Sequence, residues 1–213
     1  MNIGVVRFLG TNCDRDIWKS VKQGGHTPQW LDFRDGFEVK DIDAIILPGG
    51  FSYGDYLRSG ALAANAPVMK SVKDFADAGK PVLGICNGFQ ILCETGLLPG
   101  ALIKNKGLKF IDQWVELEQV GQAPHWGSVK PRKISLPIAH GEGQYYVKED
   151  QLKSIEDQGQ VWFRYKNDVN GSLNLIAGVM NKERNVYGMM PHPERAIKSW
   201  MGGSDGCSFF EGI

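Results

Sequence analysis

The stretch PVLGICNGFQIL, residues 81 to 92, places one thiol between two glycines, directly after an apolar run. The apolar run is typical of a buried strand, and the Phe-Gln-Ile-Leu that follows is typical of a helix. Gly84 and Gly88 stand two residues before and two residues after Cys86. Either these glycines let two elements pack closely, or the turn holds Cys86 in place for chemistry.

The segments on either side of this turn alternate between strand-like and helix-like patterns. Continuous apolar runs at 3–9, 43–50 and 81–86 predict strands, whereas the apolar residues at 11–25, 68–80 and 88–96 recur at helical spacing. Buried strands that alternate with helices indicate a parallel sheet covered on both faces. The sequence therefore predicts an α/β fold of three layers with a mostly parallel central sheet.

The pattern changes after about residue 107. Shorter strand-like runs at 109–120, 130–139, 160–165 and 172–180 are joined by polar loops. Because no linker separates the two halves, we expect additional antiparallel strands in the C-terminal half, within a single domain that spans residues 1–213.

Composition and charge argue against several classes of function. Lys+Arg and Asp+Glu both number 24, so the chain has no electrostatic footprint for nucleic acid or for an anionic membrane. We find neither a membrane-spanning apolar run nor a signal peptide, and we expect a cytoplasmic protein. The cysteines at positions 13, 86, 93 and 207 show neither metal-ligand spacing nor a disulfide framework. Cys13, Cys93 and Cys207 are expected to be buried structural thiols.

The turn around Cys86 has the spacing of a nucleophile elbow. In this motif a strand turns sharply into a helix, and the turn residue is left exposed above the end of the sheet. A helix N-terminus and a neighbouring imidazolium both favour the thiolate, which is the reactive form of cysteine. Cys86 is therefore the candidate nucleophile.

Two further motifs fall at predicted strand ends. MMPHPER, residues 189–195, contains His192 and Glu194, and the extended backbone expected before each proline would place both side chains on one side. ILPGGFSYGD, residues 46–55, ends a strand in two glycines, and the N–H groups of Gly50 and Asn87 are candidate donors to an oxyanion. The sequence lacks a phosphate-binding P-loop, so we expect no ATP site in this chain.

Ligands of open α/β sheets bind beyond the carboxyl ends of the strands. The thiol, the imidazole, the carboxylate and the backbone donors are therefore expected at one edge of the sheet. Such a set suits acyl transfer from an amide, in which a thiolate attacks, a proton reaches the departing amine and a thioester is hydrolysed.

The motifs GICNGFQIL and PHPE resemble those of class I, or triad, glutamine amidotransferases, which have a flavodoxin-like sheet. Together with LPGGFSYGDYLRSGALA and AHGEGQYY, they resemble the glutaminase subunits of phosphoribosylformylglycinamidine synthases, and the likeness covers essentially the whole chain. One departure is Leu9, since relatives tend to have a proline before the glycine of this loop.

This resemblance implies the hydrolysis of L-glutamine and the transfer of ammonia to a separate synthetase subunit. There, ATP-dependent chemistry would convert formylglycinamide ribonucleotide to the amidine in purine biosynthesis. A small third subunit is also implied. No cofactor is expected in this chain, and ATP and Mg²⁺ are expected on the synthetase.

The resemblance also implies roles for individual residues. Cys86 would be the nucleophile, His192 the general base and acid, and Glu194 the carboxylate that orients His192. Gly50 and Asn87 would supply the oxyanion donors.

Further residues are implied for binding. Gln90, one helical turn after Cys86 and on the same face, would hold glutamine together with Gly49 and Phe51. Four residues are candidates for the subunit contact or the ammonia route, with no part in the chemistry: Tyr53, Asp55, His140 and Glu142. The segment 121–133 and the residues after 210 look variable, so the resemblance implies no contacts there.

Three alternatives remain open at this stage. The chain could serve an amidotransferase with a different acceptor, or be a partner-independent cysteine hydrolase of the peptidase or deglycase type. It could also be a non-catalytic module that keeps the amidotransferase shape. Gln90 and the pairing of His192 with Glu194 argue against the hydrolase, and the intact set of thiol, imidazole and carboxylate argues against the module.

Overall fold

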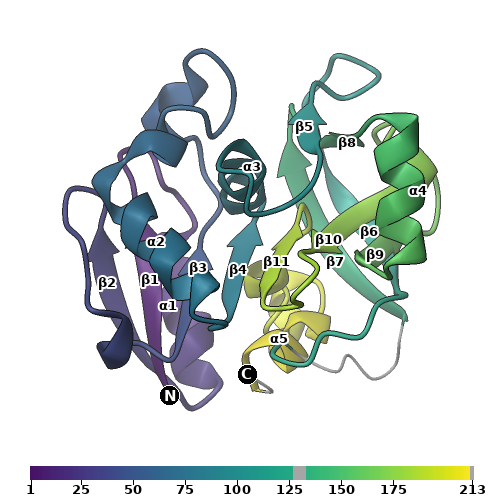
Figure 1. Cartoon of the computed structure of the whole chain (residues 1–213). Coiled ribbons are helices and arrows are strands. Elements are labelled where there is room, and N and C mark those ends of the chain that lie inside the picture. The colour runs from purple at the N-terminus through teal and green to yellow at the C-terminus, as the bar shows by residue number, and fades with distance from the viewer. Residues whose placement is uncertain (127–132, 212–213) are drawn as a thin grey trace.

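The computed structural model describes residues 1–126 and 133–211 (Figure 1). Within these residues, one nine-stranded mixed sheet forms the centre of the fold. Its strands are β1 (Asn2–Arg7), β2 (Thr27–Asp32), β3 (Ala44–Leu47), β4 (Val82–Ile85), β6 (Ile111–Gln119), β7 (Lys133–His140), β9 (Val161–Tyr165), β10 (Ile176–Met180) and β11 (Val186–Met189).

The order of the strands is β2-β1-β3-β4-β11-β10-β9-β6-β7. The strands from β2 to β11 pair in parallel, and the strands from β11 onward to β7 pair antiparallel. The antiparallel strands expected in the C-terminal half therefore extend the parallel sheet itself. Two further strands, β5 (Ala101–Ile103) and β8 (Gln144–Tyr146), form a separate antiparallel pair.

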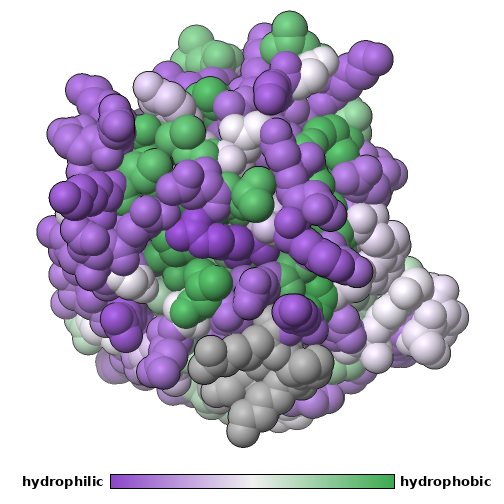
Figure 2. Space-filling model, turned by 90° about the vertical axis from the view of Figure 1, so that its right-hand side faces the viewer, coloured by the Kyte–Doolittle hydropathy of each residue, from purple (hydrophilic) through white to green (hydrophobic). Residues whose placement is uncertain are grey.

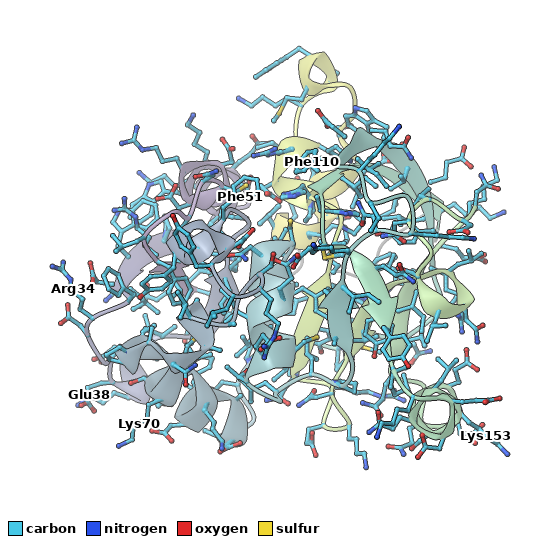
Figure 3. All side chains as sticks on the ribbon, turned by 90° about the horizontal axis from the view of Figure 1, so that it is seen from above. Arg34, Glu38, Phe51, Lys70, Phe110 and Lys153 are labelled. Atoms are coloured by element: carbon cyan, nitrogen blue, oxygen red, sulfur yellow. The ribbon has the colours of Figure 1, made fainter. Side chains whose placement is uncertain are left out.

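The helices cover both faces of the sheet, which confirms the predicted three-layer α/β fold (Figures 1 and 3). They are α1 (Asp14–Gln23), α2 (Pro67–Asp77), α3 (Asn87–Glu94), α4 (Glu149–Asp157) and α5 (Ser208–Glu211). Helices α1 and α5 contact each other on one face, and α2 and α3 lie on the other. Helix α3 packs against β3, β4 and β11, so its N-terminus lies over the middle of the sheet.

Burial explains why these segments were recognisable in the sequence. Every residue of β3 and β4 is buried, as expected for central strands covered on both faces. Helix α1 buries Ile17 and Val21, and α2 buries Val72 and Phe75, so each presents one apolar face to the sheet.

The sequence patterns missed five elements, β2, β5, β8, α4 and α5, and they set no bounds for β11, the late strand before His192. Strand β2, TPQWLD, lies at the edge of the sheet and is partly exposed, so it lacks a continuous apolar run. Helix α4 buries only Ile155. Residues 130–132 of the predicted strand 130–139 lie outside the described residues, and β7 begins at Lys133.

Among the described residues, no helix is both long and apolar enough to cross a membrane. The side of the molecule formed by the C-terminal half shows a mainly hydrophilic surface, in which hydrophobic residues form several separate patches (Figure 2).

Candidate active site

Three neighbouring parallel strands, β3, β4 and β11, place the sequence motifs at one edge of the sheet. Gly49 lies two residues after β3, Cys86 directly follows β4, and His192 lies three residues after β11. Figure 3 looks onto this edge, and the labelled Phe51 and Phe110 lie near its middle. The expected convergence of the motifs is therefore present.

The turn at Cys86 is strained and tightly packed. Cys86 precedes α3 with φ 51° and ψ −106°, a conformation that costs a non-glycine residue on the order of 1–3 kcal/mol. A Cβ added at Gly88 would lie 2.0 Å from the carbonyl oxygen of Leu47, and one at Gly84 would lie 2.6 Å from the backbone of Gly88. The close-packing interpretation of the glycines is therefore confirmed, and this packing fixes the position of the thiol in its turn.

The side chain of Cys86 is buried, and the expectation that the turn residue is exposed was wrong. Cys86 is 5% exposed, His192 2% and Glu194 0%. The Cys86 thiol lies 3.8 Å from the carbonyl oxygen of Ala139, at the end of β7. The antiparallel strand β7 thus covers the turn at Cys86, which a simple nucleophile elbow would leave exposed.

His192 and Glu194 form a direct hydrogen bond. His192 Nδ1 lies 2.7 Å from Glu194 Oε1, and the backbone N–H of His192 donates to the carbonyl of Pro137 at 2.9 Å. His192 is extended, as predicted, with φ −105° and ψ 90°. The 3-10 turn Pro193–Arg195 that follows it brings the two side chains together. With Nδ1 engaged, Nε2 of the ring is buried and has no partner among the described residues.

The electrostatic surroundings of His192 favour the imidazolium. Burial alone lowers the pKa of His192, but Glu194, Cys86 and Cys13 outweigh it, and the pKa is raised well above its usual value. Gly49 makes this arrangement possible, since a Cβ added there would lie 2.7 Å from His192 Cε1 and 3.4 Å from Cys86 Cβ. The imidazole and the thiol therefore border the same small space.

The predicted oxyanion donors lie at two turns beside Cys86. The carbonyl of Gly49 accepts hydrogen bonds from the N–H groups of Asn12 (3.2 Å) and Cys13 (3.1 Å), at the start of α1. Because a trans peptide is planar, the Gly50 N–H points in the opposite direction, away from α1. Asn87 is the first residue of α3, where a backbone N–H has no acceptor within the helix.

Gln90 lies on the Cys86 face of α3, as expected, and both ends of its amide are engaged. Its Nε2 donates to the carbonyl of Glu142 at 2.6 Å, and its Oε1 accepts from Asn87 Nδ2 at 2.9 Å. Phe51, predicted to contact substrate, is 46% exposed at the rim of this edge.

The four residues assigned to the subunit contact or the ammonia route have different surroundings. His140 is buried against Asn105 Oδ1 (3.1 Å), and burial together with His192 lowers its pKa to about 4. Tyr53 packs edge-on against Phe33. Asp55 is half-buried, and burial raises its pKa. Glu142 accepts from the Ser59 N–H at 3.2 Å. Their roles stay predictions.

Two further residues of the site, Cys13 and Arg195, were not identified from the sequence. Cys13 Sγ lies 4.0 Å from His192 Nδ1, and Arg195 Nη2 donates to that sulfur at 3.0 Å. The expectation that Cys13 is only a structural thiol is therefore insufficient. The position of Cys13 beyond the end of β1, next to β3, was the available signal.

Possible ligand atoms of Cys13, His192 and Glu194 lie within 4.8 Å of one another. The hydrogen bond between His192 and Glu194 accounts for the closeness of these two residues, so the cluster does not require a metal ion. The arrangement of a thiol, an imidazole paired with a carboxylate, and two backbone donors fits nucleophilic acyl transfer.

Comparisons with known proteins agree with this geometry. The model of the CobB/CobQ-like glutamine amidotransferase domain matches residues 1–204. Phosphoribosylformylglycinamidine synthase subunit PurQ of Trichormus variabilis and that of Nostoc sp. are each 50% identical over 100% of this chain and 96% of the relative.

Solved structures also match this chain over nearly its whole length. The structure of PurLQS from Thermotoga maritima matches with a TM-score of 0.91 and 44% identity, covering 100% of this chain and 96% of that chain. A glutamine amidotransferase from Thermotoga maritima shares the fold, with a TM-score of 0.62 and 17% identity over 95% of this chain and 81% of that chain. The chain belongs to the CobB/CobQ-like glutamine amidotransferase family.

Proposed function

We propose that this chain is the glutaminase subunit of a phosphoribosylformylglycinamidine synthase. It hydrolyses L-glutamine and delivers ammonia to a synthetase subunit that aminates formylglycinamide ribonucleotide. The observation that carries this proposal is the meeting of Cys86 with the His192–Glu194 pair at the ends of three neighbouring strands. The 50% identity to PurQ subunits over the full length supports this acceptor over a different one.

The first half of the reaction forms a thioester. The Cys86 thiolate attacks the side-chain amide carbon of glutamine, and the carbonyl oxygen becomes an oxyanion held by the N–H groups of Gly50 and Asn87. The His192 imidazolium then donates its proton to the amide nitrogen, and the C–N bond breaks to release ammonia.

The second half regenerates the Cys86 thiolate beside the His192 imidazolium. Neutral His192 accepts a proton from water, which attacks the thioester carbon, and the C–S bond breaks to release glutamate. Glu194 orients the imidazole through Nδ1 and stabilises the imidazolium in both halves.

Replacing Glu194 with glutamine tests this role through pH dependence. Glu194 is the largest of the influences that raise the pKa of His192, so its neutral replacement lowers that pKa. We expect the alkaline limb of the kcat/KM profile to move to lower pH. The comparison is a pH–rate profile beside that of Glu118→Gln, which changes an exposed carboxylate on β6. Superimposable alkaline limbs in all three proteins would contradict the assignment.

The synthetase partner is expected to bind over the loop that follows β3. In this loop Tyr56 is 73% and Leu57 86% exposed, and Tyr53, Asp55 and Leu57 have positive φ. Exposed apolar side chains on a strained loop are typical of a binding surface that changes conformation. Because the thiol and imidazole are buried, loop movement offers a route for substrate entry, and we infer that the synthetase raises glutaminase activity.

A series of hydrogen bonds connects this loop to the candidate glutamine-binding residues. The N–H of Ser59 donates to the side-chain carboxylate of Glu142 (3.2 Å). The backbone carbonyl of Glu142 accepts a hydrogen bond from Gln90 Nε2 (2.6 Å). At the other end of the loop, the N–H of Ser52 donates to Asn87 Oδ1 (3.2 Å), and Asn87 Nδ2 donates to Gln90. A shift of the loop on docking would therefore reach Gln90 from both ends.

Glu142→Ala should weaken the stimulation by the synthetase while leaving the isolated chain active. Loss of the Ser59 bond uncouples one end of the loop from Gln90, and coupling of this kind is worth about 5–150-fold. We expect stimulation to fall about fivefold or more, whereas Glu142→Gln, which keeps an acceptor oxygen, stays close to wild type. The measurement is glutamate release with and without synthetase, ATP and formylglycinamide ribonucleotide. An equal fractional loss in both conditions would point to a structural role only.

The proposed function itself is tested by reconstitution. The chain is mixed with synthetase and the small third subunit, and glutamine-dependent formation of the amidine is measured with ATP and Mg²⁺, which we place on the synthetase. Formation of the amidine from glutamine supports the proposal, and activity only with another acceptor overturns it. We place this reaction in the cytoplasm.

A further inference from the structure

The His192–Glu194 pair is surrounded by groups whose function the mechanism above does not explain. Glu194 is fully buried, and its Oε2 has no hydrogen-bond partner among the described residues. A buried carboxylate is costly unless a nearby positive charge or donor compensates it. The next residue in the chain, Arg195, carries a positive charge, and Glu194 is one of the acidic groups that raise the pKa of Arg195 against the effect of burial.

Arg195 is held in place by the Cys13 thiol. Its Nη2 donates to Cys13 Sγ at 3.0 Å, while its Nε lies 4.0 Å from Asp16 on α1. Cys13 is 2% exposed, and burial raises the pKa of its thiol. The sulfur is therefore a fixed, buried contact for a guanidinium that would otherwise reach into solvent.

The same sulfur borders the imidazole. Cys13 Sγ lies 4.0 Å from His192 Nδ1, the ring nitrogen that Glu194 also contacts. A Cβ added at Gly49 would lie 3.2 Å from this sulfur and 2.7 Å from His192 Cε1, so the thiol and the ring enclose one narrow space. Displacing the thiol gives the ring room to tilt away from the position opposite Cys86.

Within the part of the chain that the structure describes, the polar contacts of the Cys13 sulfur are those to Arg195 and His192. Cys13 precedes α1, but its side chain makes no capping hydrogen bond to that helix. Its backbone N–H, which donates to the Gly49 carbonyl, is retained by any substitution other than proline. A change of the side chain thus removes the contacts to Arg195 and His192 and leaves the turn in place.

We propose that Cys13 and Arg195 are positioning residues for the glutaminase reaction. Arg195 is anchored on the Cys13 thiol and places a positive charge on the residue next to Glu194. The thiol and the carboxylate together hold the His192 imidazole opposite Cys86. This inference rests on the proposed function, because it assigns roles to residues of the same site.

The test compares Cys13→Ala with Cys13→Ser in the assembled complex. Alanine removes the contacts, whereas serine keeps a polar group of similar shape. We expect kcat for glutamine hydrolysis to fall about tenfold in Cys13→Ala with KM changed less than about twofold, because His192 acts on the chemical step. Cys13→Ser should return kcat to within about threefold of wild type.

Arg195→Met provides a second, independent variant, at a side chain that is partly exposed. If Arg195 and Cys13 act as a unit, the double variant Cys13→Ala/Arg195→Met is no slower than the slower single variant. Multiplied losses would overturn the proposal. A rise in KM for Arg195→Met would also overturn it, because Arg195 lines a groove of about 380 Å³ with His192 and Asp16 and would then be binding substrate.

The remaining outcomes are equally decisive. Cys13→Ala at wild-type kcat, or Cys13→Ser as slow as Cys13→Ala, overturns the positioning role. Absence of glutaminase activity in the wild-type complex overturns the proposed function instead. Thermal unfolding of each variant identifies any loss of folded protein, and kcat is expressed per folded chain.

Discussion

Replacing Cys86 with alanine is expected to abolish glutamine hydrolysis, with kcat reduced by roughly 10⁴- to 10⁶-fold. No other thiol can form the thioester from the same place. Cys86 has φ 51° in the turn before α3, and Cys13, the other buried cysteine of the site, follows β1. The measurement is glutamate release by the assembled complex. Alanine has a Cβ like cysteine, so the strained turn is changed by one sulfur atom only.

Two controls separate loss of the nucleophile from loss of the fold. Cys93→Ala removes the thiol of α3 that faces the carbonyl of Pro99 at 3.8 Å, and it should leave activity near wild type. The Cys86→Ala complex should still form the amidine when ammonia is supplied in solution, because that route bypasses the thioester. Wild-type hydrolysis in Cys86→Ala would defeat the assignment of the nucleophile.

The parts of the fold that the sequence predicted are those where burial alone decides the structure. Ala44–Leu47 and Val82–Ile85 are buried on both sides, and a central parallel strand of this kind reads as a continuous apolar run. Strand β2 has no such run, because one side of an edge strand faces solvent. The six residues of β2 carry no local signal of their pairing with β1, which depends on the rest of the sheet.

The candidate site was predictable only where one motif carries the chemistry. Cys86 between two glycines, and His192 two residues before Glu194, each have a spacing with a mechanical reason. The contact of Cys13 with His192 joins residues 179 positions apart, and the contact of His140 with Asn105 joins residues 35 apart. The local sequence around Cys13 does not differ from that of an ordinary loop, and the AHGEGQYY motif around His140 does not indicate Asn105 as its partner. Topology was the better guide for Cys13, since the end of β1 lies beside the end of β3.

The burial of Cys86 could not be inferred from the elbow motif. That motif describes a strand, a turn and a helix, whereas the cover over Cys86 comes from Ala139 at the end of the antiparallel strand β7. In this protein the added half of the sheet therefore closes the site, besides supplying Pro137 as the backbone partner of His192.

Gly49→Ala should reduce kcat by about 10²-fold while the protein stays folded. The new methyl group would lie 2.7 Å from His192 Cε1, 3.2 Å from Cys13 Sγ and 3.4 Å from Cys86 Cβ. His192 cannot move away freely, because its Nδ1 is bonded to Glu194 and its N–H to Pro137. The ring atoms must therefore move by several tenths of an ångström or more. A displacement of about 1 Å is enough for a loss of this size.

Two other glycines show why this loss would belong to the chemistry and not to folding. Gly107→Ala adds a methyl group with nothing within 4 Å, and it should match wild type in both activity and thermal unfolding. Gly88→Ala places a methyl group 2.0 Å from the backbone oxygen of Leu47, which cannot yield, so this variant should lose stability. At Gly49 the neighbouring atoms belong to side chains, so the added methyl group is expected to displace these side chains and not the backbone. If Gly49→Ala keeps more than half of the wild-type kcat, the imidazole and the thiol do not share the narrow space on which the proposed mechanism depends.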